Sequence, residues 1–260
     1  MKKSTKTILK TLIFFISWLV LAVLIPIPND ISDNWWRFLA ELIPFLAIVF
    51  LTYIFSKFEK NRLFILHFEN PIKQTLVGIL LGLIWFFIPF LLLNSLGYLE
   101  ITDKNYINML SIWIVSAFIN TIMQELLVRG YIYQLLKKEY NIMIATIVST
   151  LLFTFMHGGA FEAGPMAVVN VLTMSLLMTI ILEYTNSLLM PTIMHFIWNV
   201  MGGIIFGTVS LAEDYPHLYN IKITGNSIIS GGIFKMEGSI FVFLTNIILI
   251  LIFYRMYKKK

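Results

Sequence analysis

Long apolar runs recur along the whole chain and constrain its fold more than any other feature. A helix needs about 20 apolar residues to cross the hydrocarbon core of a bilayer. Eight segments approach or exceed that length, at about residues 8–27, 35–56, 73–96, 107–136, 141–157, 165–183, 187–208 and 237–256. Hydrophobic residues make up 58% of the chain and charged residues only 13%, whereas a soluble domain is nearer half apolar and a quarter charged. The sequence therefore predicts an all-α, polytopic membrane helix bundle with about eight transmembrane helices.

Lysine and arginine are concentrated in alternate connections between these runs, while "PNDISDN" and "GGAFEAGP" contain neither. Short cytoplasmic loops are rich in Lys and Arg, so both termini are predicted to be cytoplasmic. The N-terminal run follows a basic start but lacks a small-residue cleavage site, which favours a retained helix over a signal peptide. The cations in question are Lys2, Lys3, Lys6, Lys10, Lys57, Lys60, Arg62, Lys73, Lys137, Lys138, Arg255, Lys258, Lys259 and Lys260.

The predicted organisation has three parts. Residues 1–106 hold the first three spans, residues 107–208 form a core of four spans, and residues 209–260 hold an outer loop and the last span. In the outer loop, 209–236, the stretch "YNIKIT" suggests a short extracellular strand. This loop is compatible with capping a site and with binding a partner. The net charge of +5 follows membrane topology, so nucleic acid is not an expected partner. The chain has no cysteine, which excludes disulfides and thiolate chemistry.

Several polar residues interrupt the apolar runs of the core. An ionisable group at mid-membrane costs at least a few kcal/mol and usually faces a bundle interior or a water-filled cavity. Glu125 lies four residues before Arg129, and His195 lies four residues before Asn199, so each pair shares one helix face. The full set is Asn120, Gln124, Glu125 and Arg129 in the fourth run, His157 at the end of the fifth, Asn170 in the sixth, and His195 and Asn199 in the seventh.

These residues are expected at similar depths in the membrane. At about 1.5 Å per helical residue, Glu125 lies about 18 Å and His157 about 24 Å from the predicted cytoplasmic ends of their helices. His195 and Asn199 come out at about 14 and 20 Å. Three helices are thus predicted to place a carboxylate, a guanidinium, two imidazoles and an amide in one slab. This coincidence of depth favours a functional site.

Each residue also has a purely structural interpretation. Glu125 and Arg129 could be an intrahelical ion pair, and His157 could be interfacial. His195 and Asn199 could hydrogen-bond to neighbouring helices. The same structural role is expected of Asn120 and Asn170, while Arg37 and Glu41 would form a surface-proximal pair and His67 and His217 lie in loops.

The set has the parts of a hydrolytic site. Amide hydrolysis needs a base that deprotonates water and donors that stabilise the oxyanion. A Glu and a His could hold the water, and a second His with an Asn could supply the donors. Two His and a Glu also match the ligands of zinc hydrolases, although the chain lacks an H-E-x-x-H motif.

Three motifs, in order, resemble those of the CAAX protease and bacteriocin-processing (CPBP, or Abi) intramembrane proteases. That family carries E-E-x-x-x-R, then F-x-x-x-H, then H-x-x-x-N on successive core helices. Here they stand as "QELLVRG" at 124–130, "FTFMH" at 153–157 and "HFIWN" at 195–199. The motif-bearing region is about residues 107–203, and the eight-helix layout is also similar.

The resemblance implies proteolysis within the membrane. It assigns the glutamate of motif one and His157 to the activation of water, and His195 and Asn199 to the oxyanion hole. Arg129 would orient Glu125. A metal-free mechanism with no cofactor is expected; if zinc is present, the implied ligands are Glu125, His157 and His195.

Gln124 departs from the family pattern, because it stands where the first glutamate is expected. An amide cannot accept a proton at neutral pH. Glu125 could act as the base, or Gln124 could orient the water while Glu125 supplies the charge. Alternatively catalysis is lost and the fold serves as a scaffold; Arg129 would keep Glu125 ionised and make it a weaker base.

The expected partners are the lipid bilayer and a membrane protein or peptide substrate. Eukaryotic relatives remove the C-terminal tripeptide of prenylated proteins, but this chain resembles a bacterial cytoplasmic-membrane protein. Bacterial relatives are associated with bacteriocin immunity, peptide processing and envelope regulation. A catalytically inactive scaffold or immunity protein is the main alternative. A transporter is a third, disfavoured because the sequence has no internal repeat and its polar residues share one depth.

Overall fold

The computed structural model describes residues 3–59, 70–209 and 215–260, and nearly all of the predicted spans are helical in it. Six helical stretches among these residues are long and apolar enough to cross a membrane, and two shorter apolar helices, Ile142–Met156 and Leu189–Ile205, match the fifth and seventh runs. The prediction of an all-α multi-pass bundle is confirmed. Lys2, Lys60, Arg62, His67 and part of the outer loop, 210–214, lie outside the described residues.

Two of the core spans change their hydrogen-bonding pattern at the motif residues. In the fourth span, helix α4 (Leu110–Glu125) is followed by the π-helix η1 (Leu126–Ile132) and by α5 (Tyr133–Glu139). In the seventh, α9 (Leu189–Asn199) is followed by the π-helix η2 (Val200–Ile205). π-helical turns are rare and frequently occur at functional sites. Both begin immediately after a residue that the motifs single out, Glu125 or Asn199.

The fifth and sixth spans are joined by a helical connection. Helix α6 (Ile142–Met156) ends just before His157, and the connection "GGAFEAGP" contains the short helix α7 (Gly158–Ala163). Helix α8 (Pro165–Thr185) starts after Gly164, whose φ of 106° favours glycine. His157 therefore lies at the junction of two helices.

The outer loop forms a small β ribbon. The predicted strand is confirmed as β2 (Tyr219–Ile223), which pairs antiparallel with β1 (Leu99–Lys104), a strand that the sequence did not predict. After it come α10 (Ser227–Ser230), the 3₁₀ turns η4 (Gly232–Phe234) and η5 (Met236–Gly238), and the last span α11 (Ile240–Lys258).

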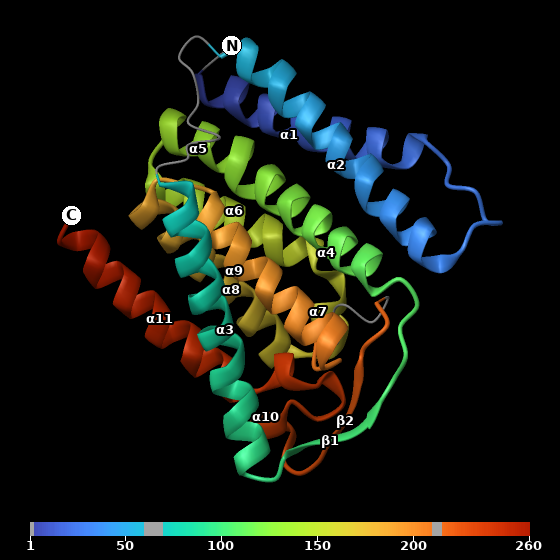
Figure 1. Ribbon diagram of the computed structural model, residues 1–260. Helices are drawn as coiled ribbons and strands as arrows, with labels where there is room; N and C mark the ends of the chain where they lie inside the picture. The colour runs from blue at the N-terminus through green and yellow to red at the C-terminus, as the bar shows by residue number, and fades with distance from the viewer. Residues whose placement is uncertain (1–2, 60–69, 210–214) are drawn as a thin grey trace. The chain divides into compact units, whose positions relative to one another are not determined.

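The chain divides into two compact units. The first comprises residues 1–67 and 109–149, and the second comprises 68–108 and 150–260. In the first unit α2 (Asp33–Lys57) packs on both α1 (Lys3–Leu24) and α4 (Figure 1). Phe14, Phe55 and Tyr131 form an aromatic cluster there, with ring centroids 4.2 to 5.5 Å apart. This cluster ties the span that carries motif one to the two N-terminal helices.

In the second unit α3 (Pro71–Ser95) runs along α9, and α11 packs on α8 (Figure 1). The α3–α9 contact is close because α3 presents Gly78 and Gly82, four residues apart, the small-residue spacing that lets membrane helices approach each other. A methyl group added at Gly82 would lie 2.8 Å from Cβ of Ile197, and one at Gly78 would lie 3.1 Å from Cβ of Ile193. The glycines thus fix the position of the helix that carries motif three.

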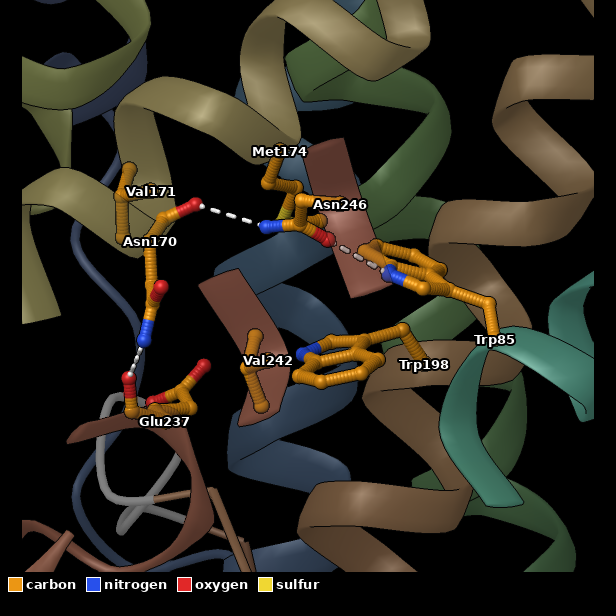
Figure 2. Close-up of a pocket in the computed structure, with 8 residues that line it drawn as sticks. All are labelled: Trp85, Asn170, Val171, Met174, Trp198, Glu237, Val242 and Asn246. Atoms are coloured by element: carbon orange, nitrogen blue, oxygen red, sulfur yellow. Dashed lines mark hydrogen bonds between the residues drawn. The ribbon is translucent and has the colours of Figure 1, made fainter. Parts of the chain in front are cut away.

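Polar side chains connect α3, α8 and α11 of the second unit around a cavity of about 10 Å³ (Figure 2). Asn246 accepts a hydrogen bond from Nε1 of Trp85 at 2.7 Å and donates to Oγ1 of Thr173 at 2.9 Å. Asn170 donates to the carbonyl of Glu237 at 2.6 Å, which confirms its predicted interhelical role. Trp85 also stacks on Trp198 with centroids 4.4 Å apart. Trp198 immediately precedes Asn199, so this polar core supports motif three.

Replacing Gly82 with alanine is expected to lower the free energy of unfolding by about 1–3 kcal/mol, the usual cost of overpacking. The added methyl group meets Cβ of Ile197 and Cα of Met194, at 2.8 and 3.2 Å, neither of which is the flexible end of a side chain. Thermal unfolding in detergent measures the effect. Gly78→Ala should cost less, and Leu80→Ala, at a position 58% exposed on the same helix, should cost least. Equal effects at the three positions would contradict this account of the packing.

Candidate active site

Motif one lies in the first unit, where α4 passes into η1. The carboxylate of Glu125 and the guanidinium of Arg129 are both fully buried, and Nη1 of Arg129 donates to Oε1 of Glu125 at 2.9 Å. The ion pair predicted from the spacing of four residues is confirmed. Burial of two charges carries a desolvation cost of several kcal/mol per ion that only good geometry and further hydrogen bonds offset. The pair thus holds an ionised carboxylate in a water-poor interior.

Gln124 belongs to a separate hydrogen-bonded chain that runs from α4 to α2. Nε2 of Gln124 donates to Oδ1 of Asn120 at 2.7 Å, and Nδ2 of Asn120 donates to Oε2 of Glu41 at 2.6 Å. Oε1 of Glu41 pairs with Nη2 of Arg37 at 2.8 Å. We refer to Arg37, Glu41, Asn120 and Gln124 as the α2–α4 polar chain. This chain links the ion pair of Arg37 and Glu41 on α2 to Gln124, the residue that departs from the family pattern.

Glu41 is therefore not the surface-proximal residue that the sequence predicted. Its exposed fraction is 5%, because its position on α2 faces α4, where Asn120 meets it. The spacing of Arg37 and Glu41 was equally compatible with an exposed pair. The available signal was that Asn120 and Gln124 also lie four residues apart, on a face of α4 that needed a polar partner.

Motif two lies in the second unit, and its backbone contact defines the tautomer of His157. Nδ1 of His157 lies 2.7 Å from the carbonyl oxygen of Phe153. A carbonyl oxygen only accepts, so Nδ1 carries the proton, and in the neutral ring Nε2 bears the lone pair. The Phe153 ring packs on the imidazole, with centroids 4.2 Å apart. The imidazole of His157 is thus held in one orientation, with its Nδ1 proton directed at the Phe153 carbonyl.

Motif three lies in the same unit. His195 is 1% exposed within α9, and Asn199, one turn later, is the last residue of that helix. The Phe153 ring also meets His195 edge-on, at a centroid distance of 5.8 Å. Phe153 therefore contacts both imidazoles, and the second unit brings His157 and His195 to the same buried phenyl ring.

The predicted site residues are thus distributed over the two units. The first unit gathers Gln124, Glu125 and Arg129; the second gathers His157, His195 and Asn199. Within either unit, over the part of the chain that the structure describes, three or more His, Asp or Glu side chains do not gather as a metal site. The zinc alternative needs Glu125 together with both histidines, and it stays a prediction.

The fold and these motifs define a multi-pass helical membrane protein that buries charged and imidazole side chains. A family model described as "Type II CAAX prenyl endopeptidase Rce1-like" matches residues 106–201, the segment that contains all three motifs. This segment is therefore similar to the Rce1-like family of CAAX proteases, which confirms the resemblance inferred from the motifs. The comparisons with curated proteins and with solved structures found no match.

Proposed function

We propose that this protein is an intramembrane endopeptidase that hydrolyses a peptide bond of a membrane-associated protein or peptide. The observation that carries the proposal is the family match over residues 106–201. That segment includes the carboxylate, the two imidazoles and the amide that water activation and oxyanion binding require. The proposed setting is a bacterial cytoplasmic membrane, with bacteriocin immunity or peptide processing as the biological role, on the strength of the resemblance alone.

Glu125 and His157 are the residues proposed to activate water. Glu125 is the one carboxylate of motif one, and its ion pair with Arg129 at 2.9 Å keeps it charged. His157 has its proton on Nδ1, at 2.7 Å from the carbonyl of Phe153, so its Nε2 can accept a hydrogen bond from water. Glu125 is proposed as the base that removes a proton from water, and Nε2 of His157 as an acceptor that orients water; a base must lie within hydrogen-bond reach of the proton that it removes.

His195 and Asn199 are the residues proposed to stabilise the oxyanion. An imidazole N–H and an amide N–H, one helical turn apart, are both suitable donors. Donors fixed in a water-poor interior act strongly because they need not reorganise as charge develops. His195 is almost fully buried, and Asn199 precedes a π-helical turn, a feature frequent at functional sites. Both observations support a binding role over a purely structural one.

A catalytically inactive scaffold or immunity protein is the second candidate function. The residue that favours it is Gln124, since the family pattern has a glutamate there and an amide cannot take up the proton of water. In that case the motif residues would bind a peptide without cleaving it. The two candidates differ in whether wild-type protein cleaves any substrate.

The deciding experiment is cleavage of a quenched membrane-peptide library by the protein in liposomes. Wild type is expected to cleave, and Glu125→Ala and His157→Ala are expected to lose cleavage. Phe155→Ala is the matched control, because it lies two residues from His157 on α6 and is 80% exposed. Activity that survives a chelator excludes a readily removable metal, whereas loss with the chelator supports zinc on Glu125, His157 and His195. An inert wild type that gains activity as Gln124→Glu would establish the inactive alternative.

A further inference from the structure

The α2–α4 polar chain contains a carboxylate that the three motifs do not include. Glu41 is 5% exposed and is bonded on both oxygens, by Asn120 at 2.6 Å and by Arg37 at 2.8 Å. Asn120 in turn accepts from Gln124 at 2.7 Å. A buried acidic group on α2 is thus two hydrogen bonds away from the side chain that replaces the expected glutamate.

The carboxylate determines the direction of every hydrogen bond in this chain. Paired with Arg37, Glu41 is ionised and can only accept, so Asn120 must turn its NH₂ group towards it. The carbonyl oxygen of Asn120 then faces Gln124, and Gln124 must donate through Nε2. Oε1 of Gln124 then points away from Asn120, and over the described parts of the chain this buried oxygen has no hydrogen-bond partner. The amide of Gln124 is thereby fixed as an acceptor.

Without a charge at position 41 this direction would not be defined. The oxygen and nitrogen of an amide are nearly isosteric, so Asn120 and Gln124 could both turn over and present an NH₂ group in place of the carbonyl oxygen. Such a group would offer a donor where water needs an acceptor. The charge of Glu41 therefore decides whether the oxygen or the NH₂ group of Gln124 points away from Asn120.

We infer that Glu41 is a positioning residue, which acts through Asn120 to hold Oε1 of Gln124 as an acceptor for the attacking water. This inference rests on the proposed function. The proton of the water passes to the carboxylate of Glu125 as the water oxygen bonds to the substrate carbonyl carbon, whose π electrons move onto the carbonyl oxygen. The C=O bond then re-forms, the C–N bond breaks, and the leaving amine takes the proton from Glu125; Gln124 only orients the water. The acidic residue absent from position 124 is in this way compensated by one on a neighbouring helix.

The test measures kcat and KM for Glu41→Gln in liposomes, with a peptide that wild type cleaves. An amide at position 41 allows the chain to reverse, and kcat is expected to fall about 10- to 100-fold, as misplacement of a reacting group does, with KM changed less than about twofold because substrate binding is not involved. Thr52→Val is the matched control: it removes another buried polar group of α2, 8% exposed, and should leave both constants unchanged. An unchanged kcat in Glu41→Gln would overturn the inference.

A rescue variant separates positioning from a structural role. Glu41→Gln combined with Gln124→Glu exchanges the carboxylate and the amide, so that Asn120 donates to position 124 and accepts from position 41. The double variant is expected to recover kcat to within about threefold of wild type, and to exceed Gln124→Glu alone, in which two carboxylates compete for Asn120. A double variant as slow as Glu41→Gln would show that Glu41 only joins α2 to α4, which also overturns the inference.

Failure of the proposed function has a different signature. If wild type and all variants cleave nothing, the proposed function fails. The coupling between positions 41 and 124 is then tested by the thermal unfolding of wild type, Glu41→Gln, Gln124→Glu and the double variant. Coupling through Asn120 predicts that the exchanged double variant unfolds at least about 2 °C above the value expected from adding the two single shifts. Strictly additive shifts would mean that position 41 does not control the amide at position 124.

Discussion

Replacing Glu125 with glutamine is expected to reduce kcat for peptide cleavage by about 10²- to 10⁴-fold, the range that a general base contributes. Glutamine has the shape of glutamate, and its amide oxygen can still accept the hydrogen bond that Nη1 of Arg129 donates at 2.9 Å. What is lost is the capacity to take a proton from water. Initial rates in liposomes, with KM determined separately, measure the effect, and KM should change little because the substitution leaves the shape of the site intact.

The control for this prediction is Glu139→Gln, which neutralises another acidic residue of the same span, in α5. It should retain the wild-type kcat. Thermal unfolding of Glu125→Gln must be measured alongside, because Arg129 is fully buried and loses its counter-ion in this variant. A folded Glu125→Gln protein that keeps more than about a tenth of the wild-type kcat would show that another group deprotonates the water.

The helices could be predicted from the sequence because a membrane span follows a simple physical rule. Every backbone polar group must be satisfied within the bilayer, so a long apolar run can hardly be anything but a helix. The same reasoning located the ion pair, since a spacing of four residues brings Glu125 and Arg129 to one face. Both predictions depend on local geometry alone.

The π-helical turns could not be predicted in this way. Their residues, 126–132 and 200–205, are mostly apolar or small like those of the α-helices before them, and hydrophobicity does not distinguish the two hydrogen-bonding patterns. The strand β1 was missed for a related reason. Its residues 99–104 are mostly exposed and mixed in polarity, and its conformation depends on pairing with β2, more than a hundred residues later in the chain.

The parts of the candidate site that depend on packing were also missed. Phe153 was noted only as a motif residue, yet its ring contacts the imidazoles of both His157 and His195. Glu41 was placed near the surface because an ion pair with Arg37 is equally compatible with water. Which face of α2 meets α4 depends on tertiary contacts, and only those contacts turn Glu41 and Asn120 into a connection to Gln124.

Replacing Arg129 with methionine is expected to lower the free energy of unfolding by about 3–5 kcal/mol, the cost of removing one partner of a buried ion pair. Methionine retains much of the apolar volume of the arginine side chain but provides no charge. The carboxylate of Glu125, with an exposed fraction of 0%, would be left ionised in the interior or forced to take up a proton. Thermal or denaturant unfolding in detergent measures the loss, and Lys138→Met, at an exposed position of α5, is the matched control.

The double variant Glu125→Gln with Arg129→Met decides what that loss means. Because it removes both charges, it should be more stable than Arg129→Met alone, since no uncompensated charge stays buried. It should nevertheless cleave no faster than Glu125→Gln, because the double variant regains stability but still lacks the carboxylate of Glu125. If the double variant were less stable than either single one, the two effects would simply accumulate, and Arg129 would stabilise the fold through contacts other than its pair with Glu125. Recovery of stability without recovery of activity would instead separate the two roles of the pair, with Arg129 balancing the charge that Glu125 needs for catalysis.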